Sequence, residues 1–107
     1  MKVSIDFSVY TDVDGAFGYV SGEIDVIESP QVGDTISFIS PSSDLVIDSL
    51  LGFDGHLKVT DRVIAANRSD SRVMLALSDV GLAKKDDAVK LMAYMEKAFG
   101  LFASKYE

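Results

Sequence analysis

Residues 3–26 read VSIDFSVYTDVDGAFGYVSGEIDV, and this stretch decides the fold. Apolar and polar side chains alternate on both sides of Asp14-Gly15, a dipeptide typical of a two-residue hairpin turn. Because the side chains of a strand point alternately to its two faces, each arm acquires one apolar face. The stretch therefore predicts an antiparallel hairpin with an apolar side and a polar side.

Centring the turn on Asp14 and Gly15 sets the register of this hairpin. Four inward pairs result: Val9 with Val20, Phe7 with Gly22, Ile5 with Ile24, and Val3 with Val26. A slip of one residue would turn all these side chains to the opposite face. We therefore expect this face to be buried, with the Phe7 ring covering Gly22, which has no side chain of its own.

The same register defines an outward face that is acidic and aromatic. Its candidate partner-binding residues are Asp6, Tyr10, Phe17, Tyr19, Glu23 and Asp25. Asp6 would lie opposite Glu23, and like charges in direct opposition destabilise a sheet. Such a local conflict can mark a functional surface. The alternative is an acidic face kept for solubility.

Downstream of the hairpin, turn signals recur about every ten residues, as in a β-rich domain. We predict strands over residues 36–38, 45–51, 57–64 and 72–80, with a second hairpin turn at Asp54-Gly55. A helical turn is the alternative for 45–51. The apolar pattern changes phase after Val59, which predicts a β-bulge near Asp61. Apolar residues on both faces of 72–80 indicate a strand in the sheet centre or under a helix.

The last part of the chain predicts an amphipathic helix. Its apolar residues recur at helical spacing: Ala88, Leu91, Met92, Met95, Phe99 and Phe102. Asp86 or Asp87 would cap its first turn, and Gly100 would end or weaken it.

Together these elements predict a single α+β domain over residues 1–107. It would consist of an antiparallel sheet of about six strands, with one C-terminal amphipathic helix packed on it. The strand order stays open at this point, so a barrel, an open sheet and a sandwich all fit.

The charge of the chain is uneven. The 107 residues carry a formal net charge of −7. Residues 1–54 hold ten acidic side chains and one basic side chain, a net charge of −9, and residues 55–107 hold seven acidic and nine basic, a net charge of +2. Because phosphate groups repel an acidic chain, we expect neither nucleic acid nor an anionic membrane as a partner.

Two further features bear on the location of the protein. The N-terminus alternates polar and apolar residues from the start, as in a strand and unlike a signal peptide. No apolar run approaches the length that crosses a bilayer. We therefore expect a cytoplasmic protein.

Motifs for catalysis or cofactors are weak. The chain has no cysteine, which excludes disulfides and thiolate metal sites. His56 is the only histidine, and no Gly-x-Ser-x-Gly elbow or phosphate-binding glycine motif accompanies it. The Asp12-Val13-Asp14-Gly15 segment lacks the first and twelfth ligands of a calcium loop. We predict no cofactor and no metal, and we expect that the protein is not an enzyme.

These observations favour a non-enzymatic protein-interaction module that uses the acidic, tyrosine-bearing face of the first hairpin. Its partner would be a basic protein or a second copy of the chain, since an acidic face steers basic partners. An inhibitor or immunity-type protein for a basic enzyme is one form of such a module. The alternative is a small-ligand-binding or enzymatic domain with a pocket between sheet and helix, where His56 or Arg62 would supply the polar group.

Overall fold

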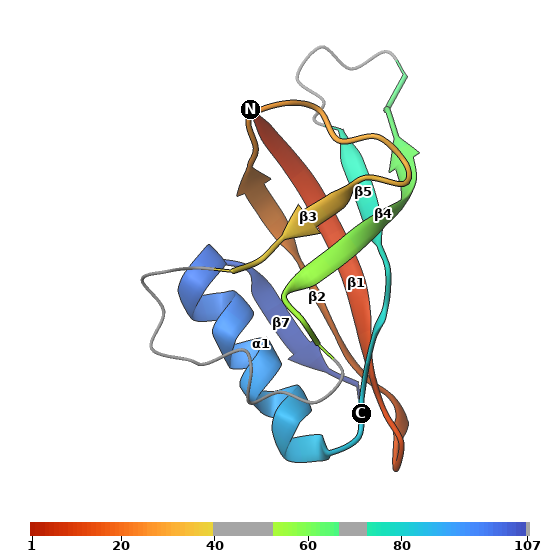
Figure 1. Ribbon diagram of the computed structural model, residues 1–107, viewed down its shortest axis with the longest axis vertical. Helices are drawn as coiled ribbons and strands as arrows, with labels where there is room; N and C mark the ends of the chain where they lie inside the picture. Colours follow the sequence, from red (N-terminus) through yellow and green to blue (C-terminus); the bar gives the residue numbers. More distant parts are fainter. Residues whose placement is uncertain (40–52, 67–72, 107) are drawn as a thin grey trace.

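The computed structural model describes residues 1–39, 53–66 and 73–106. Its strands are β1 (Lys2–Thr11), β2 (Gly15–Asp25), β3 (Thr35–Ser37), β4 (His56–Val63), β5 (Met74–Leu77), β6 (Val80–Leu82) and β7 (Phe102–Lys105), and its helix is α1 (Lys85–Phe99). The strands form one mostly antiparallel sheet, and α1 packs across one side of it (Figure 1). The predicted α+β class is confirmed, and the sheet is open.

Strand β1 is the centre of this sheet. The strand order is β3-β4-β5-β1-β2-β7, and β6 pairs with β1 on the same edge as β5. The β1–β5 and β1–β6 pairs are parallel, whereas the other pairs are antiparallel. The strand predicted over 72–80 is therefore two short strands in line. Its β5 part lies between β4 and β1, which confirms the predicted central position.

The first hairpin has the predicted faces but a different register. Phe7 pairs with Val20 rather than with Gly22, a displacement of two residues. The reason is the turn: Thr11 pairs with Gly15, so three residues form the loop. The Asp14 N–H donates to the Thr11 hydroxyl at 3.0 Å, which stabilises this wider turn. A shift of two residues preserves the faces because the side-chain period is two.

The corrected register removes the predicted conflict on the outward face. Asp6 pairs with Ser21, and Glu23 pairs with Ser4. The expectation that Asp6 and Glu23 lie directly opposite each other is therefore wrong.

A β-bulge near the turn reorients Phe17. Val9 pairs with Gly18 and Tyr10 pairs with Ala16, so Phe17 is the extra residue of its strand. Its side chain is only 4% exposed, and the Lys105 Nζ lies 5.3 Å from the ring centroid. The prediction that Phe17 faces outward is wrong, because the bulge breaks the alternation on which it rested.

The core lies between the sheet and α1. Val3, Ile5, Phe7 and Val9 form the buried face of β1, and they belong to one apolar cluster with buried residues of α1 that include Ala88, Leu91, Met92 and Met95. The predicted burial of these helix residues is confirmed. Complete burial of one such large apolar side chain stabilises the fold by about 1.5–3 kcal/mol.

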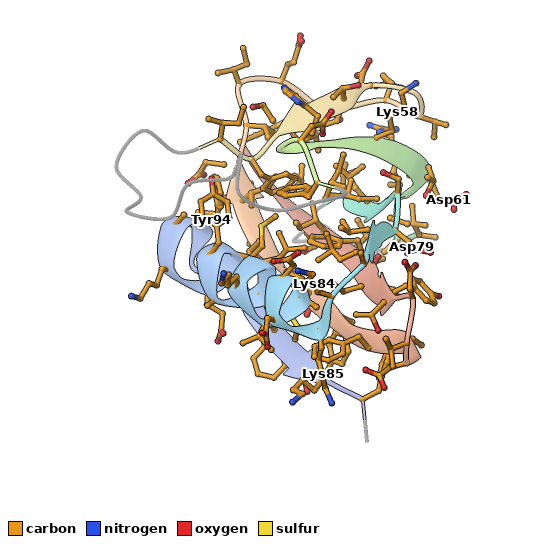
Figure 2. All side chains as sticks on the ribbon, turned by 60° about the horizontal axis from the view of Figure 1, so that its bottom comes forward. Lys58, Asp61, Asp79, Lys84, Lys85 and Tyr94 are labelled. Atoms are coloured by element: carbon orange, nitrogen blue, oxygen red, sulfur yellow. The ribbon has the colours of Figure 1, made fainter. Side chains whose placement is uncertain are left out.

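Helix α1 begins without a side-chain cap. Lys84 occupies the N-cap position, and Asp86 and Asp87 lie in the first turn. The predicted capping by an aspartate is wrong, although both carboxylates complement the positive end of the helix dipole. The Tyr94 side chain points from α1 toward the end of β3 (Figure 2), where its hydroxyl donates to the Phe38 carbonyl.

Gly100 ends the helix and allows a seventh strand. It adopts the left-handed conformation at φ 65°, and its N–H donates to the Glu96 carbonyl. The chain then reverses into β7, which pairs with β2. Phe102 therefore lies on a strand and is 58% exposed. Its predicted place on the helix face is wrong.

Two glycines of β2 allow the segment that follows α1 to pack closely against β2. A Cβ atom at Gly18 would lie 2.5 Å from the Ser104 carbonyl oxygen of β7. Gly22 has φ 145°, and a Cβ atom there would lie 2.8 Å from Leu101 Cδ2. No larger residue fits at either position without a shift of the backbone or of Leu101.

The remaining predictions concern the middle of the chain. The register of β4 against β5 shifts between Val59 and Asp61, which confirms the predicted bulge. At the predicted turn, Gly55 has φ 90° and the Asp54 carboxylate accepts a hydrogen bond from the His56 N–H at 3.0 Å. The strand predicted over 45–51 lies outside the described residues.

We predict that Gly18→Ala destabilises the protein by about 1–3 kcal/mol, the usual cost of an overpacked site. The added methyl group must push β7 away from β2. Gly81→Ala is the matched control, because no atom lies within 4 Å of a Cβ there, and it should change stability by less than about 0.5 kcal/mol. Urea denaturation measures both. Equal stability of the two variants would contradict the close approach of β7.

Candidate functional site

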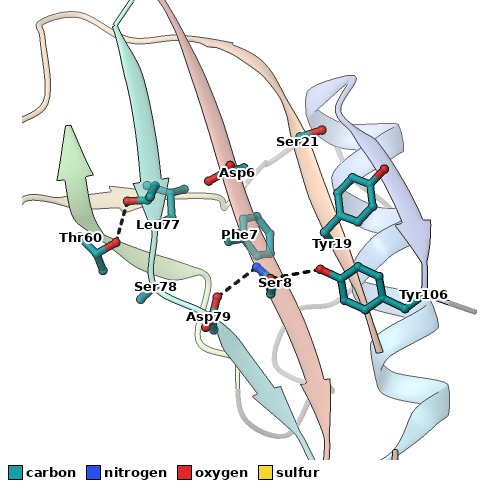
Figure 3. Close-up of a pocket in the computed structure, with 11 residues that line it drawn as sticks. Asp6, Phe7, Ser8, Tyr19, Ser21, Thr60, Leu77, Ser78, Asp79 and Tyr106 are labelled. Carbon is teal, nitrogen blue, oxygen red and sulfur yellow. Dashed lines mark hydrogen bonds between the residues drawn. The ribbon is translucent and has the colours of Figure 1, made fainter. Parts of the chain in front are cut away.

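The outer face of the sheet, which we define as the face opposite α1, holds a depression of about 570 Å³ (Figure 3). It extends over β1, β2, β4, β5 and the residues that follow β5 and β7. Its polar lining consists of two carboxylates (Asp6, Asp79), two phenols (Tyr19, Tyr106) and four aliphatic hydroxyls (Ser8, Ser21, Thr60, Ser78). We call it the first depression.

Asp79 reaches this position because it lies at the break between β5 and β6. Strand β1 pairs with β5 as far as Asp6 and with β6 from Val9 onward. Ser8 therefore lies opposite the break, and its backbone N–H donates to Asp79 Oδ1 at 3.1 Å (Figure 3). The carboxylate replaces the strand carbonyl that the break removes.

Ser78 connects the same break to β4. Its Oγ accepts a hydrogen bond from the Lys58 N–H at 3.1 Å, and its own N–H donates to the Lys58 carbonyl at 2.8 Å. The two residues of the break are thus anchored to strands on both sides. Such anchoring holds the Asp79 carboxylate at one place on the outer face.

An aromatic wall borders the first depression on the side of β2 and β7. The Tyr19 ring lies 5.7 Å from the Tyr106 ring and 6.2 Å from the Phe102 ring. The Tyr106 hydroxyl lies 3.5 Å from Ser8 Oγ. Tyr106 remains 46% exposed, so the wall presents apolar ring surface to solvent beside the carboxylates.

The electrostatic character of the first depression is acidic. No described basic residue lines it. Within the described part of the chain, the Asp6 side chain forms no ion pair or hydrogen bond. Asp79 uses Oδ1 for the Ser8 N–H, and its second oxygen has no hydrogen-bond partner among these residues. Both carboxylates can therefore accept hydrogen bonds from a cationic ligand.

A second depression of about 450 Å³ adjoins the first and shares Asp6 and Ser21 with it. It continues along β1 and β2 to Glu23, and Met74 of β5 borders it. The two depressions together form a shallow groove that follows the central strands across the outer face.

The predicted site residues separate into three groups. Asp6 and Tyr19 line the first depression, and Asp6 and Glu23 line the second. Tyr10 and Asp25 are exposed outside both depressions, and Phe17 is buried.

The structure adds Asp79 and Tyr106, which sequence reasoning missed. One signal was available for Tyr106. Because Gly100 ends the helix, enough residues follow it to form one more strand. Asp79 had no local signal, because its position depends on the pairing of β1 with two separate strands.

Other candidate chemistry finds little support in the described residues. They contain no group of three or more side chains suited to hold a metal ion. His56 is exposed, with its Nδ1 3.8 Å from Asp54 Oδ1. Arg62 donates to the Ser29 hydroxyl at 2.9 Å. Among these residues, no helix has both the length and the apolar character needed to cross a membrane.

Comparison of the chain with protein-family models, curated proteins and solved structures finds no match.

We predict that Asp79→Ala destabilises the protein by about 1 kcal/mol, because the Ser8 N–H loses a charged acceptor at the break. Amide hydrogen exchange at Ser8 should accelerate in the same variant. Asp61→Ala is the control: this exposed carboxylate on β4 makes no described hydrogen bond. Unchanged exchange at Ser8 in the Asp79 variant would show that the carboxylate does not hold the break.

Proposed function

We propose that this protein is a non-enzymatic protein-interaction module that docks a basic protein segment on the outer face of its sheet. The observation that carries the proposal is the groove formed by the two adjoining depressions, with Asp6 where they meet. Acidic side chains steer a basic partner to this face and select against acidic partners.

The shape of the groove supports an extended segment as the partner. The groove runs from the Tyr19 and Tyr106 rings at one end to Glu23 at the other, along the direction of β1 and β2. Exposed aromatic rings at one end supply the contact area that interfaces need. A segment lying along the groove would contact the tyrosine rings at one end and the carboxylates farther along.

One form of this module is a small inhibitor of a basic enzyme, such as an immunity protein against a nuclease toxin. An enzyme that binds nucleic acid presents basic side chains at its active site. An acidic groove would cover those side chains and exclude the phosphate backbone. The net charge of −7 favours such an encounter over long distances.

A second copy of the chain is the alternative basic partner. Lys84 and Lys85 lie at the start of α1 (Figure 2), and Lys90 and Lys97 are exposed along it. This surface could meet the outer face of a neighbouring copy. Because the two surfaces differ, such an assembly would be head-to-tail and would grow with concentration.

The other alternative was a ligand pocket between the sheet and the helix. Buried apolar side chains occupy that interface in the described residues, among them Leu91 and Met95. The outer face carries the polar groups, so it is the better candidate for recognition.

We predict that a short peptide of alternating arginine, lysine and glycine residues binds to the outer face. The chemical shifts of amides on β1, β2 and β5 should change in an NMR titration, and those on α1 should not. Asp6→Lys should weaken binding by about tenfold, which corresponds to about 1.4 kcal/mol. Asp86→Lys makes the same change of charge as Asp6→Lys but on α1, so this variant should bind the peptide as tightly as the unchanged protein.

Two results would contradict this function. One is a set of shifts centred on α1 or on the β3–β4 hairpin. The other is an equal loss of affinity in the two variants, which would indicate attraction by net charge alone. Light scattering across a range of concentrations tests the second copy as partner: a constant monomer mass supports a separate partner, and growth that high salt reverses supports self-association.

A further inference from the structure

We infer that the first depression is a pocket for the side chain of an arginine residue of the partner. This inference rests on the proposed function and deepens it, because it names the group that the groove would recognise. It depends on three features of the depression: the two carboxylates, the rings of Tyr19 and Tyr106, and the absence of any described basic residue in its lining.

The two carboxylates come from neighbouring parts of the sheet: Asp6 from β1, and Asp79 from the break between β5 and β6. Asp6 projects from β1, and Asp79 is held beside the same strand by its hydrogen bond to the Ser8 N–H (Figure 3). A guanidinium group is suited to separated acceptors of this kind, since it has five N–H donors in one plane. An ammonium group has three donors around a single point and satisfies fewer separated acceptors.

The tyrosine rings favour the same cation. Tyr19 and Tyr106 lie 5.7 Å apart with an interplanar angle of 33°, and Tyr106 is partly exposed. A guanidinium group stacks on an aromatic face and is more weakly hydrated than an ammonium group, so it loses less when it leaves water. The ring surface therefore adds to the preference for arginine over lysine that the two carboxylates create.

The hydroxyl groups complete the set of acceptors. Ser8 lies between Asp79 and the Tyr106 ring, and Ser21 lies on β2 opposite Asp6 (Figure 3). Thr60 donates its own proton to the Ala76 carbonyl at 3.1 Å, which leaves its oxygen able to accept. The depression thus offers hydroxyl oxygens as acceptors in addition to the two carboxylates.

Other ligand classes fit less well. The two carboxylates repel phosphate, sulfate and other anions. A tightly held divalent cation needs several converging ligands, and the described residues contain no such group. An apolar side chain would bury the carboxylates without hydrogen bonds, which is unfavourable.

The test uses three short peptides, each blocked at both ends, with arginine, lysine or citrulline between two glycines. Citrulline has nearly the shape of arginine but carries no charge. Each is titrated into the isotope-labelled protein and followed by NMR. The arginine peptide should bind about tenfold more tightly than the lysine peptide, citrulline should give no saturable shift, and the largest changes should fall on Asp6, Ser8 and Asp79.

Two variants assign the preference to named groups. Asp6→Asn keeps the shape of the side chain and should remove most of the arginine affinity, while Asp86→Asn on α1 should leave it unchanged. Tyr106→Leu should bring arginine binding close to lysine binding, because the stacking surface is lost. The amide spectrum of each variant reports whether the fold is retained.

The outcomes separate this inference from the proposed function. Equal binding of the arginine and lysine peptides on the outer face overturns the arginine pocket and leaves the docking of basic segments in place. Shifts outside the first depression also overturn the pocket. If the longer basic peptide described above binds nowhere on the outer face, the docking function itself is overturned.

Discussion

The hydrogen bond from the Ser8 N–H to the Asp79 carboxylate is the interaction on which the outer face depends. Strand β1 must be paired along both edges, yet its parallel neighbour is interrupted between β5 and β6. The carboxylate accepts the hydrogen bond of the Ser8 N–H at that interruption and so continues the ladder there. The same contact places an acidic group in the groove. One side chain thus serves the continuity of the sheet and the charge of its outer face.

The two faces of β1 differ in what they contact. Its apolar face, from Val3 to Val9, packs with α1 and supplies the burial that stabilises the domain. Its polar face carries Asp6 and Ser8 into the groove. Under the proposed docking function, substitutions on the polar face would change recognition without opening the core.

Sequence reasoning predicted the faces of the hairpin, the helix and the bulge near Asp61, because each follows from local periodicity. It could not predict the register, since a three-residue turn and a bulge at Phe17 replaced the two-residue turn that Asp14-Gly15 favours. Alternation alone predicted that Asp6 faces outward, whereas the opposition to Glu23 that marked it as a site candidate depended on the wrong register. Asp79 had no local signal and Tyr106 had only the end of the helix at Gly100, because their places depend on pairings between segments far apart in the chain.

The most direct test of this account is the set of intermolecular NOEs between a bound arginine-containing peptide and the isotope-labelled protein. NOEs report proton pairs in close contact, so they locate the arginine side chain without any substitution. The account predicts contacts from the arginine methylene protons to the rings of Tyr19 and Tyr106. Contacts only to residues of α1 such as Val89, with none to either ring, would contradict it.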